Sequence, residues 1–97
     1  MKNIETIKNA ISKNRALLAE NYKVKIIGIF GSYARGNIRE KSDLDILVEF
    51  SESPDIFKFI ELERFLSNLT GAKVDLVTKK ALKPLIKNEI LKETIYI

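Results

Sequence analysis

Two acids one residue apart, Asp43 and Asp45, are the side chains of this sequence best suited to chemistry. They open an apolar, strand-like run, and because strand side chains alternate between faces, both acids project to the same side. Two neighbouring carboxylates repel each other unless a cation lies between them or one of them takes a proton. Oxygen ligands of this kind suit Mg²⁺ or Mn²⁺. The pair therefore predicts a metal site at the start of a strand.

A glycine–serine turn precedes the acids, between an apolar run that ends at Phe30 and a polar loop. Gly31 can take a positive φ or bring the backbone close to a ligand. Ser32 adds a hydroxyl and an N–H at the start of a short helix, where unpaired N–H groups favour an anion. Gly36 is placed to end that helix. A phosphate cradle followed by two carboxylates predicts a site for a metal-bound nucleotide.

A third acid, Asp75, lies at the centre of a short apolar run. Burial of a lone carboxylate is costly, so this side chain must face solvent, a partner or a metal. If its strand neighbours that of Asp45, three carboxylates converge beside the glycine–serine turn. The third could then deprotonate or orient an attacking hydroxyl. Taken alone, the sequence leaves Asp75 open between a catalytic residue and a surface strand residue.

Four other polar side chains lie near these motifs. Arg35 is a candidate phosphate contact, and a structural clamp on the turn is an equal alternative. Ser42 is predicted to cap or hydrogen-bond the loop rather than to react. Arg39 and Lys41 could reach a nucleotide from that loop, an interpretation that we rank below a solvated, exposed loop.

Two helices are predicted on either side of these motifs. One runs from Asn3 to about Glu20, and the other begins with Ser53 as N-cap and Pro54 at its first position and ends at Gly71. The apolar positions of the first recur at helical spacing and predict a core-facing stripe: Ile4, Ile7, Ile11, Leu17 and Leu18. Three aromatic side chains of the second are predicted to be core rather than a base-stacking platform: Phe57, Phe59 and Phe65.

Strands are predicted at Val24–Phe30, Asp43–Phe50 and Lys73–Val77. A lysine-rich helical segment starts at Thr78 and restarts at Pro84, and residues 94–97 could form a short last strand. This order predicts an α/β (α+β) sandwich in which helices flank a small mixed sheet of three to four strands. We expect residues 1–97 to form a single domain.

The composition narrows the possible chemistry. The 97 residues include no cysteine and no histidine, which excludes thiolate sites and removes the commonest general base. The net charge of +4 is compatible with polyanions, but a solvated lysine-rich surface is the simpler interpretation. We therefore do not expect nucleic acid as a direct partner. No apolar run is long enough for a signal peptide or a membrane span, so we expect a cytoplasmic protein.

The pattern Gly-Ser-x-Ala-Arg-Gly-x₅-Ser-Asp-x-Asp begins at Gly31 and ends at Asp45. It resembles the signature of the nucleotidyltransferase superfamily that includes DNA polymerase β, and most closely its minimal nucleotidyltransferase (MNT) branch. The resemblance covers nearly the whole chain and extends to the strand of Asp75. It includes no added domain of the kind that larger relatives use to hold an acceptor.

The resemblance implies a role for each matching residue. Gly31 and Ser32 would hold the β- and γ-phosphates of a nucleoside triphosphate, with ATP as the family default. Asp43 and Asp45 would bind two Mg²⁺ ions, and Asp75 would share one ion and activate the acceptor hydroxyl. That hydroxyl would attack the α-phosphorus in line, and pyrophosphate would leave.

The resemblance also implies a partner. Small members of the branch are often encoded with a helical HEPN toxin, act as its antitoxin, and resemble enzymes that transfer AMP from ATP to a tyrosine of that toxin. A non-catalytic antitoxin that neutralises the HEPN protein by binding is the alternative, motivated by the apolar, lysine-flanked segment Leu82–Ile97. A nucleic-acid-binding protein ranks well below both because it rests on positive charge alone.

Overall fold

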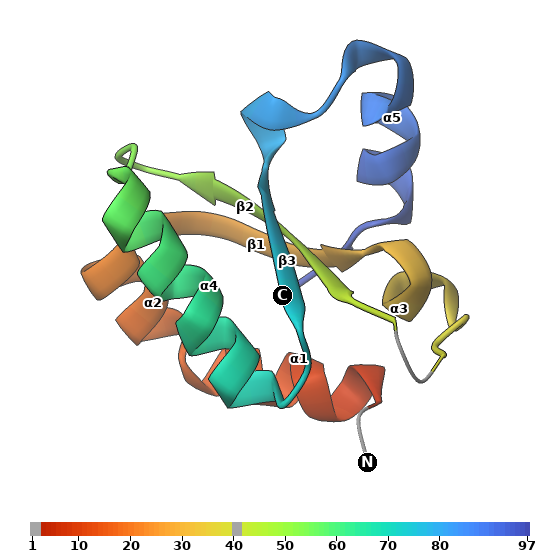
Figure 1. Ribbon diagram of the computed structural model, residues 1–97, viewed down its shortest axis with the longest axis horizontal. Helices are drawn as coiled ribbons and strands as arrows, with labels where there is room; N and C mark the ends of the chain where they lie inside the picture. The colour runs from red at the N-terminus through yellow and green to blue at the C-terminus, as the bar shows by residue number, and fades with distance from the viewer. Residues whose placement is uncertain (1–2, 40–41) are drawn as a thin grey trace.

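The computed structural model describes residues 3–39 and 42–97, which fold around a four-stranded mixed sheet (Figure 1). Its strands are β1 (Val24–Phe30), β2 (Leu44–Phe50), β3 (Val74–Thr78) and β4 (Ile95–Tyr96). Their order is β3-β2-β1-β4, with β1 antiparallel to β2 and β4, and with β2 parallel to β3. The predicted α+β architecture with a small mixed sheet is therefore confirmed.

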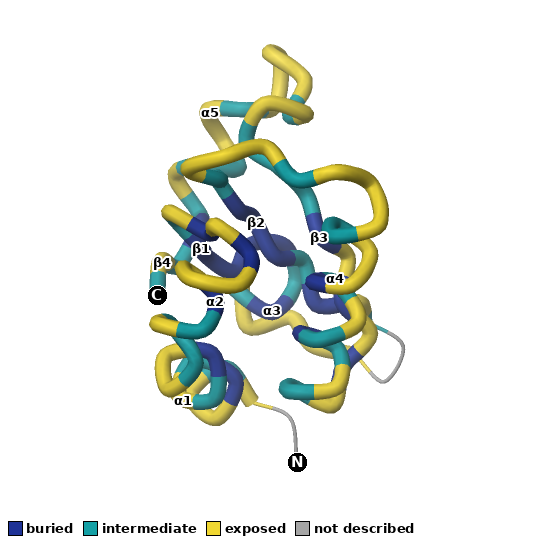
Figure 2. Tube along the Cα trace, turned by 90° about the vertical axis from the view of Figure 1, so that its left-hand side faces the viewer, coloured by how far each residue is buried: buried dark blue, intermediate teal, exposed yellow. Residues whose placement is uncertain are grey.

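Helices cover one face of this sheet and leave much of the other open. The helical elements are α1 (Ile4–Lys13), α2 (Arg15–Tyr22), α3 (Gly31–Arg35), α4 (Ile56–Thr70), the 3₁₀ turn η1 (Lys79–Ala81) and α5 (Pro84–Glu93). In Figure 1, α1, α2 and α4 lie together on one side of the sheet, whereas α3 and α5 lie at its other end. Figure 2 shows the buried segments concentrated between the sheet and the first group, while α5 contributes none.

The hydrophobic core determines which face of the sheet carries the acids. Ile46 and Val48 of β2 and Ile27 of β1 are fully buried among the side chains of α1, α2 and α4. Burial of each such side chain stabilises the fold by roughly 1.5–3 kcal/mol. Because β2 alternates, Asp45 and Glu49 must then point to the opposite face. A one-residue slip in register would bury the acids, so the apolar pattern fixes their orientation.

The prediction of one helix from Asn3 to Glu20 is wrong, because the chain breaks into α1 and α2 at Asn14. The Asn14 side-chain amide donates to the Ala10 carbonyl at 2.9 Å, and its backbone leaves helical geometry at φ −107° and ψ 13°. Asparagine competes with helical hydrogen bonding in this way. The second helix ends at Tyr22, after which Lys23 takes a left-handed conformation.

The predicted start of α4 is wrong by two residues. Asp55, not Ser53, is the N-cap, and its carboxylate accepts a hydrogen bond from the Lys58 N–H at 2.8 Å. Pro54 consequently precedes the helix instead of opening it. The predicted terminator is confirmed, since Gly71 follows α4 in a left-handed conformation at φ 71°.

One aromatic residue of α4 is not core, contrary to prediction. Phe57 is 80% exposed, whereas Phe59 and Phe65 are partly buried against the core. Two residues of helix turn the side chain by about 200°, so Phe57 and Phe59 cannot share a face.

Towards the C-terminus, Thr78 ends β3 and is also the N-cap of η1, so a lysine-rich helical turn does start there, as predicted. Helix α5 begins at Pro84, which confirms the predicted restart. The short last strand is confirmed as β4. Within residues 3–39 and 42–97, no helix has both the length and the apolar character needed to cross a bilayer.

Candidate active site

Two of the three acids lie side by side on adjacent strands. Parallel pairing of β2 with β3 makes Asp45 and Asp75 direct neighbours. From the sequence alone, the meeting of these acids depended on this strand pairing. The register is held by flanking residues, including a hydrogen bond of 2.8 Å from the Leu44 N–H to the Lys73 carbonyl. Paired strands lie about 4.8 Å apart, so both carboxylates start from one short stretch of the open face. Asp43 is exposed one residue before β2.

The electrostatics show how closely these acids interact. The pKa of Asp45 is raised from 3.8 to about 6, first because the side chain is partly buried and then because Asp75 and Asp43 carry like charges. Glu93 acts in the same direction, and the Arg35 guanidinium opposes them. A cation between the carboxylates would relieve this repulsion.

The donor set fits part of a Mg²⁺ shell. All three acids offer carboxylate oxygens, the ligands that Mg²⁺ prefers. Within the described part of the chain, however, no three acidic side chains lie close enough to hold a metal ion by themselves. Mg²⁺ is commonly bound by one or two carboxylates together with substrate phosphates and water. The acids therefore fit a metal that arrives with a nucleotide better than a permanent metal centre.

Gly31 is required here for two separate reasons. Its φ is +73°, a conformation that residues with side chains rarely adopt. A Cβ atom at this position would also lie 3.0 Å from Cγ and 3.3 Å from Cβ of Asp45. The turn from β1 into α3 thus passes directly beside the Asp45 carboxylate, and glycine leaves room for that carboxylate in its present orientation.

The donors of this turn are held by a residue that the sequence analysis missed. The Gly31 N–H donates to Oε1 of Glu93 at 3.0 Å, and Nη1 of Arg35 donates to both carboxylate oxygens of Glu93 at 3.2 and 3.1 Å. Arg35 therefore acts as a structural clamp in this structure, one of its two predicted roles. Glu93 lies 58 and 62 residues further along the chain, and no local pattern could have revealed it.

The other candidate residues are less involved. Ser32 is half-buried in the first turn of α3. Ser42 accepts a hydrogen bond from the Arg39 N–H at 2.8 Å, which confirms its predicted role in the loop. Arg39 is exposed, and Lys41 lies outside the described residues.

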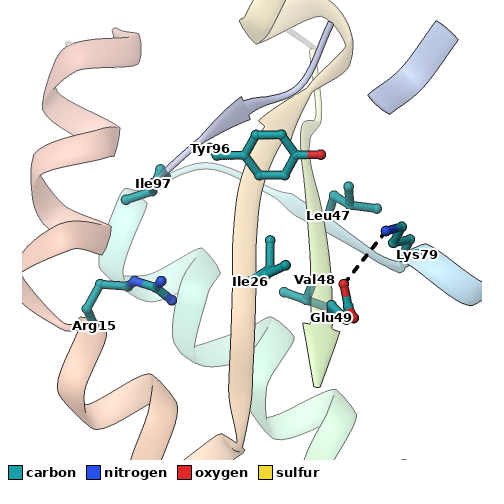
Figure 3. Close-up of a pocket in the computed structure, with 8 residues that line it drawn as sticks. All are labelled: Arg15, Ile26, Leu47, Val48, Glu49, Lys79, Tyr96 and Ile97. Atoms are coloured by element: carbon teal, nitrogen blue, oxygen red, sulfur yellow. Dashed lines mark ion pairs between the residues drawn. The ribbon is translucent and has the colours of Figure 1, made fainter. Parts of the chain in front are cut away.

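The open face continues from the acids into a hollow of about 390 Å³ (Figure 3). The Tyr96 ring lies across β1, where Gly28 pairs with Tyr96, and extends toward Leu47 of β2. A Cβ at Gly28 would lie 3.2 Å from the Tyr96 ring, so glycine permits this crossing. An ion pair of 3.9 Å between Lys79 and Glu49 borders the hollow. Apart from Gly28, no residue pattern in the sequence indicates this hollow.

Comparison with known proteins identifies the family. The family model described as "Nucleotidyltransferase domain" matches residues 11–97. The chain belongs to the nucleotidyltransferase domain family. This nucleotidyltransferase also superposes on a solved minimal nucleotidyltransferase with a TM-score of 0.81 and 34% identity, covering 96% of this chain and 94% of that one. The resemblance to the MNT branch is thereby confirmed.

Three further matches are informative. The protein adenylyltransferase MntA of Thermococcus cleftensis is 45% identical over 97 residues, covering 100% of this nucleotidyltransferase and 98% of that protein. The crystal structure of a toxin–antitoxin with AMP-PNP matches with a TM-score of 0.74 and 29% identity, over 92% of this chain and 70% of that one. A protein of Methanocaldococcus jannaschii is 57% identical over 98 residues, the full length of both chains.

Proposed function

We propose that this nucleotidyltransferase transfers AMP from ATP to a tyrosine hydroxyl of a HEPN toxin and thereby acts as its antitoxin. The observation that carries the proposal is the pairing of Asp45 with Asp75 on the open face of the sheet, beside the turn at Gly31. The name of the Thermococcus relative supports an adenylyl group as the one transferred. The toxin–antitoxin structure with AMP-PNP supports an adenine nucleotide and a toxin as partner.

In this proposal, Asp43 and Asp45 hold two Mg²⁺ ions together with phosphate oxygens of ATP. The bound ions would neutralise phosphate charge and polarise the transferring group. The resemblance implies that Gly31 and Ser32 would bind the β- and γ-phosphates of ATP. Ser32 follows Gly31, and Gly31 lies against the Asp45 carboxylate, so phosphates held at Ser32 would lie beside the acids.

Asp75 supplies the proton acceptor of the proposed step. It is exposed at the edge strand of the sheet, where a hydroxyl from another protein can approach. The tyrosine oxygen forms a bond to the α-phosphorus, the bond from that phosphorus to the pyrophosphate oxygen breaks, and the tyrosine proton passes to the Asp75 carboxylate. Positioning and charge neutralisation supply most of the acceleration in transfers of this type.

The test incubates the chain with α-labelled ATP, Mg²⁺ and the HEPN protein proposed as its partner, followed by intact mass measurement. We expect an adenylyl mass gain on the HEPN protein that is lost in the Asp43→Asn/Asp45→Asn variant. Glu52→Gln, an exposed acid of the loop before α4, is the matched control and should retain transfer. Transfer by the double Asp variant at the rate of the parent would refute the proposal.

A second candidate function, neutralisation by binding alone, is favoured by apolar side chains exposed on α5. Leu85 is 95% exposed and Ile86 is 46% exposed, and α5 buries none of its residues. Large exposed apolar side chains grouped together are typical of a protein interface. This alternative predicts that the Asp43→Asn/Asp45→Asn variant still neutralises the toxin in cells, whereas the catalytic proposal predicts that it does not.

A further inference from the structure

Glu93 occupies a fixed place between two elements. It is the last residue of α5, and β4 begins two residues later on the edge of β1. Thr94 is buried and its hydroxyl donates to the Ile90 carbonyl at 2.6 Å, while the Ile97 N–H donates to the Ile27 carbonyl at 2.9 Å. The backbone on both sides of Glu93 is therefore anchored, and its side chain is only 27% exposed.

From this position, the Glu93 carboxylate accepts hydrogen bonds from two donors, one in the glycine–serine turn and one on Arg35. Oε1 accepts from the Gly31 N–H, and both oxygens accept from Nη1 of Arg35. A hydrogen bond between two charged groups is about twice as strong as one between neutral groups. The guanidinium has five N–H donors. Among residues 3–39 and 42–97, Arg35 donates to Glu93 alone and only through Nη1, so with respect to these residues Nε and Nη2 can bind a further anion.

We propose that Glu93 is a positioning residue for nucleotide binding, which acts through Arg35 and the Gly31 turn. This inference rests on the proposed function and revises one part of it. The Gly31 N–H is committed to Glu93, so the phosphates are held by Ser32 and by the remaining N–H groups of Arg35. Gly31 contributes its backbone conformation and the space beside Asp45 instead of a phosphate contact.

The test measures the Kd of ATP with Mg²⁺, and in parallel KM and kcat for transfer, in Glu93→Ala and Glu93→Gln. We expect Glu93→Ala to raise the Kd and the KM about tenfold, the factor that corresponds to 1.4 kcal/mol, with a smaller change in kcat. Glu93→Gln should have an intermediate Kd because its amide oxygen still accepts from the Gly31 N–H but no longer carries charge for Arg35. Glu89→Gln, exposed one turn earlier on α5, is the control and should bind ATP as the parent does.

The Arg35→Ala background tests whether Glu93 acts through the guanidinium. We expect Glu93→Ala to weaken ATP binding much less there than in the parent, whereas equal and additive losses would contradict the proposal. Unchanged or tighter ATP binding by both Glu93 variants would also overturn the proposal. This holds even if the variants have lower melting temperatures, because a loss of stability alone would show only a structural role. If Glu93→Ala does not fold, Glu93→Gln decides. If the parent binds ATP but transfers nothing, the proposed function fails while the Kd comparison still tests Glu93.

Discussion

The replacement of Gly31 by alanine separates backbone strain from displacement of the catalytic acid. Gly31 begins and Gly36 ends the short helix α3, and their φ angles of +73° and +74° are nearly equal. A Cβ at Gly36 would meet no atom within 4 Å, whereas a Cβ at Gly31 would collide with the Asp45 carboxylate. Gly36→Ala is therefore a matched control that carries the backbone strain without the collision.

The magnitudes follow from these contacts. A left-handed conformation costs a residue with a side chain about 1–2 kcal/mol, and both variants should lose that much of the free energy of unfolding. At Gly31 the new methyl group adds an overpacking cost of about 1–3 kcal/mol. The overpacking cost should lie at the low end of this range because the end of the Asp45 side chain can rotate away from the new methyl group. That rotation moves the Asp45 carboxylate away from Asp75. A displacement of about 1 Å can reduce a reaction rate about 100-fold.

The assay combines urea denaturation with adenylyl transfer. We expect Gly31→Ala to be about 1 kcal/mol less stable than Gly36→Ala, which lowers the melting temperature by roughly a further 4–8 °C. We also expect it to lose most transfer activity, while Gly36→Ala keeps it. In an Asp45→Ala background, the extra loss of stability at Gly31 should shrink. Equal stability and equal activity of the two glycine variants would refute the assigned collision.

Three further predictions address other parts of the molecule. Gly28→Ala should lower the free energy of unfolding by about 1–3 kcal/mol, because its Cβ would overlap Thr94 and Tyr96 and displace β4; equal amide exchange of β4 in both proteins would contradict this. The raised pKa of Asp45 means that the folded state binds a proton more tightly than the unfolded state, so in EDTA the stability should fall as the pH rises from about 4 to about 6. Asp45→Asn should flatten that slope in urea titrations, and an unchanged slope would assign it to other groups. Leu85→Asp should change the melting temperature by no more than about 2–4 °C but weaken the complex with the HEPN protein in a pull-down, since Leu85 is 95% exposed. An equally strong complex would place the interface elsewhere.

Much of the fold was predictable because local rules determined it. The apolar runs fixed three strands, and their alternation oriented Asp45 correctly. Gly36 and Gly71 ended helices as predicted because a left-handed terminator favours glycine at any such position. Predictions failed where two local signals competed, as at Asn14, whose side chain interrupts the first helix, and at Asp55, which caps α4 in place of Ser53.

The candidate site was partly determined by the sequence alone. The spacing of Gly31, Ser32, Asp43 and Asp45 specified a turn followed by two acids, and this pattern identified the family. The roles of these residues in binding metal and nucleotide remain proposals that the variants above test. What the sequence determined is thus the set of chemical groups and the local geometry of each motif.

Only the tertiary structure decided which distant groups meet. Parallel pairing of β2 with β3 brought Asp75 beside Asp45, and the return of the chain through α5 brought Glu93 to Gly31 and Arg35. The exposed position of Leu85 likewise depends on where α5 lies relative to the sheet. The physical reason is that helix and turn signals act over a few residues, whereas strand pairing and the docking of a terminal segment are set by burial summed over the whole core.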